Sequence, residues 1–302
     1  MESIINKIEK LKKEKDAVIL AHYYVNDQVQ ALADYVGDSY FLSKISATVP
    51  QKTILFCGVS FMGESAKILS PDKTVIMPDA LADCPMAHMV DVERIEAVRK
   101  QYEDIAVVCY INSTAEIKAH SDVCVTSANA LKIVKALPQK NIYFIPDENL
   151  GRYVAGFVPD KNFIFNHGFC HVHTSITKES VEQAKAVQRS AKILVHPECT
   201  LDVIELADYV GSTSGIIDYA TASDADSFII CTEMGVLYEL QQKNPNKKFY
   251  FVGHKQFCPN MKRITVEKIV DALEKGHNTV ELEEGLRIRA NKALTKMLEL
   301  AK

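Results

Sequence analysis

The sequence predicts an α/β protein made of three repeated three-layer αβα sandwich domains with parallel sheets, in a pseudo-threefold arrangement. One observation behind this prediction is that short apolar runs, bounded by Gly and Pro, alternate with helical segments of about ten residues, as in parallel sheets with crossover helices. The other is a repeat, because Cys84, Cys170 and Cys258 lie 86 and 88 residues apart in similar surroundings. One folding unit therefore occurs three times.

Each copy begins with an amphipathic helix that leads into an apolar strand. We expect these helices at 3–13, 92–101 and 180–189, and the strands at 17–21, 105–109 and 192–195. The strands end in the segments His22-Tyr23-Tyr24, Tyr110-Ile111-Asn112 and His196-Pro197-Glu198. These strand ends are 88 and 86 residues apart, so they follow the spacing of the cysteines.

The inner part of each copy keeps the same register. An aspartate comes twelve residues after each strand end and a hydroxyl residue five residues later, which gives the sets Asp34, Asp122, Asp208 and Ser39, Ser127, Thr213. Further helices are expected at 41–49, 128–137 and 216–222, followed by strands at 53–57, 141–145 and 228–231. A helix near residues 62, 150 and 234 then leads into a last strand at 74–77, 162–165 and 248–252. Each last strand runs into its cysteine loop.

The repeat also predicts the domain boundaries, with domains at 1–88, 89–173 and 174–263. The segment 264–302 starts another helix at 265–275, but no strand follows it. This helix carries an apolar stripe that has to be buried, formed by Val266, Ile269, Val270 and Leu273. We therefore expect the C-terminal tail to pack back on the first domain.

Composition narrows the class of protein. The chain has 302 residues, 47% of them hydrophobic and 25% charged, as in an ordinary globular protein. A formal net charge of −4 without a basic stripe argues against a nucleic-acid partner. The lysine-rich start lacks an apolar signal region and no apolar run approaches the length of a membrane helix, so we expect a cytoplasmic protein without a membrane partner. Eight cysteines in such a chain are expected as buried thiols and metal ligands rather than disulfides.

The residues capable of chemistry are expected at one edge of each sheet. In an open parallel sheet, ligands bind outside the carboxyl ends of the strands. Pseudo-threefold symmetry would turn the three edges towards one cavity, bringing together His22, Tyr24, Ser39, Tyr110, Asn112, Ser127, His196, Glu198 and Thr213. The three hydroxyl residues among them suit either helix N-caps or a phosphate or carboxylate site.

Three cysteines on three such loops suggest a metal centre with one open position. Closed zinc sites and electron-transfer iron–sulfur clusters usually have four protein ligands. Three thiolates leave one metal position open, where an iron acts as a Lewis acid on a hydroxyl or carboxylate. The alternative is that Cys84, Cys170 and Cys258 are ordinary buried cysteines, as we expect for Cys57, Cys109, Cys124, Cys199 and Cys231. His173, near Cys170, suits a supporting role around the metal.

The chain resembles the quinolinate synthase family of de novo NAD biosynthesis along its whole length. The resemblance rests on nine segments: Ala21-His-Tyr-Tyr24, Ala33-Asp-Tyr-Val-Gly-Asp-Ser39, Asp83-Cys-Pro-Met86, Tyr110-Ile-Asn-Ser-Thr114, Thr126-Ser-Ala-Asn129, Gly168-Phe-Cys-His-Val-His173, Val195-His-Pro-Glu-Cys199, Tyr209-Val-Gly-Ser-Thr213 and Cys258-Pro-Asn-Met261. It implies a triangular fold around one 4Fe-4S cluster held by Cys84, Cys170 and Cys258. It also implies that iminoaspartate condenses with dihydroxyacetone phosphate to quinolinate, with loss of phosphate and water. Tyr23 departs from the polar residue expected there.

The residue chemistry suits that reaction. Ser127 and Thr213 would hold a carboxylate or phosphate, while both substrates would be fixed by His22, Ser39, Tyr110, Asn112 and His196, with Ile111 and Pro197 completing the binding segments. Glu198 is the best general base, because a carboxylate in a dry cavity can be tuned towards a neutral pKa. Tyr24, Tyr110 and His196 are its candidate catalytic partners.

Two other classes of function stay open. One is an iron–sulfur hydro-lyase acting on a small hydroxy acid, which would need no triose phosphate. The other is a non-enzymatic iron–sulfur sensor, which would bind no small diacid. For the synthase, functional coupling to an L-aspartate-oxidising enzyme is expected.

Overall fold

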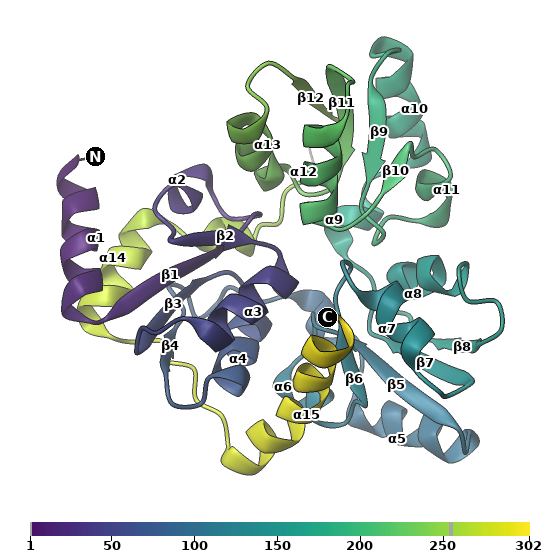
Figure 1. Cartoon of the computed structure of the whole chain (residues 1–302), viewed down its shortest axis with the longest axis horizontal. Coiled ribbons are helices and arrows are strands. Elements are labelled where there is room, and N and C mark those ends of the chain that lie inside the picture. Colours follow the sequence, from purple (N-terminus) through teal and green to yellow (C-terminus); the bar gives the residue numbers. More distant parts are fainter. Residues whose placement is uncertain (1, 254–255) are drawn as a thin grey trace.

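The computed structural model describes residues 2–253 and 256–302, and it shows the α/β class that the repeat predicts. Within these residues there are three four-stranded parallel sheets, with strand orders β2-β1-β3-β4, β6-β5-β7-β8 and β10-β9-β11-β12. The three sheet units surround a common centre and give the molecule a triangular outline (Figure 1). The prediction of three repeated αβα sandwiches is confirmed.

The elements follow the same order in each unit. The first unit contains α1 (Glu2–Glu14), β1 (Ala17–His22), α2 (Asp27–Gln30), β2 (Tyr35–Gly37), α3 (Ser39–Thr48), β3 (Thr53–Cys57), α4 (Ser60–Leu69), β4 (Thr74–Ile76) and η1 (Pro85–His88). The second contains α5 (Val92–Gln101), β5 (Ile105–Tyr110), α6 (Ala115–Ala119), β6 (Val123–Val125), α7 (Ala130–Ala136), β7 (Asn141–Ile145), α8 (Glu148–Ala155), β8 (Asn162–Phe165) and α9 (His171–Thr174). The third contains α10 (Lys178–Val187), β9 (Lys192–Val195), α11 (Leu201–Ile204), β10 (Tyr209–Val210), α12 (Thr213–Ala222), β11 (Ser227–Cys231), η2 (Met234–Val236), α13 (Leu237–Lys243), β12 (Lys248–Phe251) and η3 (Met261–Arg263). Helices α14 (Val266–Lys275) and α15 (Glu284–Leu300) complete the chain.

The repeated aspartates have a structural role. Oδ2 of Asp34, Asp122 and Asp208 accepts the backbone N–H of Ile19, Val107 and Ile193, at 2.8, 2.7 and 2.7 Å respectively. Each of these N–H groups belongs to the opening strand of its unit, at the point where the short neighbouring strand has not yet begun. A buried N–H without an acceptor is costly, so the carboxylate replaces the missing strand partner.

The C-terminal segment packs on two units rather than one. Helix α14 lies against α1, whereas α15 contacts α6, β6 and α7 of the second unit as well as α4 of the first (Figure 1). The expected packing on the first domain is seen for α14 and, through α4, for α15, but α15 also lies on the second unit. Its buried stripe, which includes Ala290, Leu294 and Met297, needs an apolar surface on both sides, and the junction between the two units supplies it.

The domain boundaries at 88/89, 173/174 and 263/264 stay a prediction. The twelve strands found in the described residues lie inside the corresponding ranges. In the described part of the chain, every helix is too short or too polar to span a membrane.

Candidate active site

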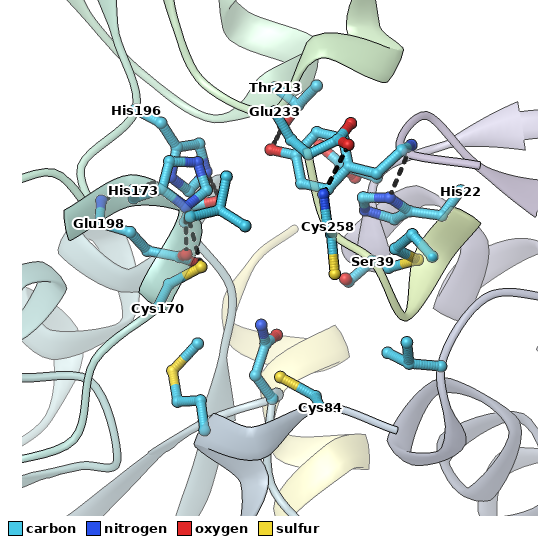
Figure 2. Close-up of a pocket in the computed structure, with 18 of the residues that line it drawn as sticks. His22, Ser39, Cys84, Cys170, His173, His196, Glu198, Thr213, Glu233 and Cys258 are labelled. Atoms are coloured by element: carbon cyan, nitrogen blue, oxygen red, sulfur yellow. Dashed lines mark hydrogen bonds and ion pairs between the residues drawn. The ribbon is translucent and has the colours of Figure 1, made fainter. Parts of the chain in front are cut away.

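A cavity lies where the three sheet units meet. Twelve of the fourteen predicted site residues line it: His22, Tyr24, Ser39, Cys84, Tyr110, Asn112, Ser127, Cys170, His196, Glu198, Thr213 and Cys258. Figure 2 shows labelled side chains from all three units pointing into the same space. The other two, Ile111 and Pro197, are buried but do not line this cavity.

His22 and His196 are held as neutral hydrogen-bond donors. Nδ1 of His22 accepts the backbone N–H of Tyr24 at 3.2 Å, and Nδ1 of His196 accepts that of Glu198 at 3.3 Å. Burial lowers the pKa of both imidazoles to about 3. Because Nδ1 accepts a hydrogen bond, the ring hydrogen is on Nε2. In His196 this group lies 3.2 Å from Oγ of Ser127.

Glu198 is a buried carboxylate with two close partners. Its Oε2 lies 2.8 Å from Nδ1 of His173, and its Oε1 accepts a hydrogen bond from the Tyr110 hydroxyl. Burial alone would raise the pKa of Glu198, but the neighbouring His173 and His196 rings and the hydrogen bond from Tyr110 outweigh it and hold the pKa below its usual range. The expectation of a pKa tuned upwards therefore does not hold, and Glu198 is ionised at neutral pH.

Tyr24 and Tyr110 are protonated phenols. Burial, followed by the nearby Glu198 carboxylate, raises the pKa of both well above 10. The hydroxyl of Tyr24 lies 2.6 Å from Oγ1 of Thr213 and 2.8 Å from that of Thr232. Both tyrosines can therefore donate a proton or a hydrogen bond, but neither is a base at neutral pH.

The hydroxyl residues at the cavity are not helix caps. Helix α3 is capped by Asp38, which accepts the N–H of Phe41, and α12 is capped by Ser212. Ser39 and Thr213 are instead the first residues of these helices. Their hydroxyls and the neighbouring N–H groups of the helix N-terminus can therefore donate hydrogen bonds to an anionic ligand.

Two polar atoms in the cavity wall have no hydrogen-bond partner among the described residues. Oδ1 of Asn112 and Oγ1 of Thr126 are buried, and neither forms a hydrogen bond. Both residues line the cavity. Buried polar atoms in native proteins are normally paired, so these two are available to a polar ligand or a water molecule in the cavity.

Cys84, Cys170 and Cys258 bring one thiol each to this cavity. They lie on the loops after β4, β8 and β12, and their sulfur atoms face the same space (Figure 2). Burial and then the neighbouring Cys258 raise the pKa of Cys84 to about 12, so an added cation is needed to favour the thiolates. The remaining five cysteines are fully buried away from the cavity, at Cys57, Cys109, Cys124, Cys199 and Cys231.

Three convergent thiols match the donor set of an iron–sulfur cluster, because soft thiolates are its usual protein ligands. A second, smaller group of possible metal ligands includes one of these thiols, that of Cys170. Ligand atoms of Cys170, His173 and Glu198 all lie within 4.8 Å of one another. The protein therefore has a possible metal-binding group at the cavity wall.

The threefold repeat does not predict two of the cavity residues, His173 and Glu233. His173 lies in α9, three residues after Cys170, so it shares a helical face with that ligand loop. The matching positions after the other cysteines hold Ala87 and Met261, so the repeat gave no signal for it. Glu233, two residues after β11, accepts the N–H of Cys258 at 2.9 Å. An acid also stands two residues after β7, at Asp147, which was a usable signal.

Comparisons with known proteins agree over the full length. A family model described as "Quinolinate synthetase A protein" matches residues 6–299. A quinolinate synthase from Caldicellulosiruptor bescii is 53% identical over 300 residues, which cover 99% of both chains. Those from Clostridioides difficile and Fusobacterium nucleatum are 51% and 50% identical, covering 97% of both chains in the first case and 98% of this chain and 99% of the relative in the second. The protein is thus an enzyme, and the chain belongs to the quinolinate synthetase A protein family.

Proposed function

We propose that the enzyme condenses iminoaspartate with dihydroxyacetone phosphate to give quinolinate, with release of phosphate and water. The observation that carries the proposal is the convergence of three thiols, from three separate units, on a cavity that also holds an ionised Glu198 and two neutral histidines. One bound cofactor and two small anions would account for this set of groups.

Cys84, Cys170 and Cys258 would hold a 4Fe-4S cluster with three protein ligands. When bound, such a cluster supplies an open iron that acts as a Lewis acid on the hydroxyl leaving as water. Asp83 and Glu233 would position two of these loops, because their carboxylates accept the N–H of Cys84 at 2.8 Å and of Cys258 at 2.9 Å.

The two substrates would be bound mainly by neutral donors. Among the described residues that line the cavity, none is Lys or Arg, although both substrates are anions. The Nε2–H groups of His22 and His196 and the hydroxyl of Ser127 can donate to carboxylate or phosphate oxygens. Ser39 and Thr213 add hydroxyls at helix N-termini, where a negative charge is stabilised.

Glu198 would move protons during the enolisation of the triose phosphate. Its ionised carboxylate can take a proton from the carbon beside the carbonyl group. Tyr110 hydrogen-bonds to this carboxylate and stays protonated, so it would position Glu198 rather than compete with it as a base. Tyr24, also protonated, is the second candidate proton donor.

A hydro-lyase acting on a small hydroxy acid is the second candidate function. The closeness of Glu198 to Cys170 favours it, because an ionised base beside a metal ligand also suits the loss of water from a hydroxy acid. A sensor without catalysis gains no support from the many convergent polar groups of the cavity.

We also propose that the enzyme acts in the cytoplasm. An imine such as iminoaspartate is hydrolysed in water, so functional coupling to an enzyme that oxidises L-aspartate would provide it freshly.

The experiment is anaerobic cluster reconstitution followed by an assay for quinolinate. Quinolinate should form when iminoaspartate and dihydroxyacetone phosphate are both present, and should not form when either is omitted. Dehydration of a hydroxy acid without triose phosphate would instead establish the hydro-lyase. No turnover, together with a cluster EPR spectrum that dicarboxylates leave unchanged, would overturn both enzymatic functions.

A further inference from the structure

A buried lysine lies just outside the wall of the cavity. Lys118, in α6, is fully buried and is not one of the residues that line the cavity. Its ammonium group donates to the carbonyl of Ser113, the residue after Asn112, and lies 5.4 Å from the centroid of the Phe61 ring. Asn112 and Phe61 both line the cavity. The ammonium therefore supports two segments of the cavity wall from the outside.

The charge of Lys118 has no carboxylate partner among the described residues. Its contacts with a carbonyl and with an aromatic ring are contacts with uncharged groups. Glu64, in the same helix as Phe61, accepts the backbone N–H of Ala115 at 2.8 Å instead. A buried charge is normally paired, because its removal from water is costly. An unpaired ammonium at this place indicates that the charge itself has a use.

The thiol of Cys109 responds to this charge. Burial would raise the pKa of Cys109, but a hydrogen bond with Cys124 and then the charge of Lys118 lower it to about 7. A thiol with this pKa is about half ionised at neutral pH, so it offsets only part of the positive charge. The remainder acts on the cavity, because a dry interior screens a charge only weakly.

The hydrogen bond that Lys118 forms does not require a charge. Gln30 holds the equivalent place in the first unit, 88 residues earlier in the chain. Its buried amide donates to the carbonyl of Val25 at 3.1 Å, and Val25 corresponds to Ser113 in the repeat. A neutral side chain is therefore sufficient to hold the loop after the opening strand. The shared sheet architecture does not explain an ammonium group in the second unit.

We propose that Lys118 is a binding residue that acts through space: its positive charge, held behind the cavity wall, strengthens the binding of the anionic substrates. No Lys or Arg among the described residues lines the cavity, and Glu198 adds a negative charge to it. Lys262 is already paired with Glu233 at 3.2 Å. The proposal rests on the proposed function, because it takes the substrates to be two small anions.

The test compares three variants of Lys118 in the holoenzyme. Lys118→Gln removes the charge but keeps a donor for the carbonyl of Ser113, as Gln30 does for Val25. Lys118→Arg keeps the charge, and Lys118→Met removes both the charge and the donor. Lys135→Met, an exposed change in α7, is the matched control. Melting temperature and cluster absorption show which variants are folded and loaded.

Binding is measured by anaerobic calorimetry with two probes, the dianion succinate and its monoanionic amide, succinamate. In Lys118→Gln and Lys118→Met we expect the Kd to rise about tenfold for succinate and about threefold for succinamate, because the Coulomb energy scales with the ligand charge. Lys118→Arg and the control should bind succinate within about threefold of wild type. In turnover, the two neutral variants should raise the KM for dihydroxyacetone phosphate about tenfold and keep kcat within about twofold.

Wild-type affinity for succinate in Lys118→Gln would overturn the proposal, because the hydrogen bond to Ser113 would then be sufficient. Equal rises in Kd for succinate and succinamate would also overturn it, because a packing defect does not depend on the charge of the ligand. If Lys118→Arg or Lys118→Met does not fold, the ratio of the two Kd values in Lys118→Gln decides. Wild type that binds succinate but forms no quinolinate would refute the proposed function alone, since the binding measurements do not need turnover.

Discussion

His22 and His196 form the same hydrogen-bonded turn in two different units, because Nδ1 of each ring accepts the N–H of the residue two positions ahead. A proton on Nδ1 would break that bond and place a charge in a buried site. The two rings therefore present Nε2–H groups to the cavity at neutral pH. The repeated turn explains how one folding unit can supply the same donor twice.

This arrangement predicts a loss of stability in mild acid. Burial lowers the pKa of both histidines to about 3 in the folded protein, whereas an unfolded histidine titrates near its ordinary value of about 6.5. The unfolded chain binds more protons between these values, so stability is present above about pH 6.5 and falls as the pH drops towards 3. Between pH 7 and 5 each histidine should lower the free energy of unfolding by about 2 kcal/mol.

Urea unfolding of wild type and of the double variant His22→Asn, His196→Asn checks this. The variant should lose clearly less stability over the same pH interval, because its side chains do not titrate there. Equal losses in both proteins would show that these histidines are not held neutral by the fold.

Replacing Glu198 by Gln should lower quinolinate formation by about 10²- to 10⁴-fold, the usual contribution of a general base. The amide keeps the size of the side chain but cannot take a proton. Cluster absorption should stay at the wild-type level, because Glu198 is not one of the proposed cluster ligands. Glu182→Gln, an exposed change in α10, serves as the control. Retained turnover in Glu198→Gln would remove this carboxylate from the mechanism.

Asp122→Ala tests the structural role of the repeated aspartates. It would leave the buried N–H of Val107 without its acceptor and remove the 2.9 Å contact to Arg99. The expected cost is about 1–3 kcal/mol, seen as a melting temperature lowered by several degrees. Asp122→Asn keeps one carbonyl oxygen and should lose less. An unchanged melting temperature in Asp122→Ala, equal to that of the exposed control Asp160→Ala, would contradict this role.

The repeat made most of the fold predictable from sequence. Each unit must bury a parallel sheet, so the order of apolar strands and amphipathic helices is visible in the residues themselves. The position of α15 was not predictable in the same way. An apolar stripe such as Ala290, Leu294 and Met297 shows that a helix face is buried, but it does not show which surface covers it.

The site was predictable where its residues follow the repeat and not where they depart from it. His22, Tyr110 and His196 occupy equivalent strand ends and do line the cavity. His173 has no equivalent in the other units, so only the folded geometry brings it to Glu198. The pKa of Glu198 was missed for the same reason, because it depends on the contact with His173.

We propose above that thiols from all three units hold one cluster. The most direct test measures iron and sulfide in anaerobically purified wild type and in Cys84→Ser, Cys170→Ser and Cys258→Ser, with Cys57→Ala as the control. We predict about four irons and four sulfides per chain in wild type and in the control, and near loss of both in each of the three serine variants. A single metal ion that survives in Cys84→Ser and Cys258→Ser but is lost in Cys170→Ser would contradict the account, because it would place the metal on Cys170, His173 and Glu198 alone.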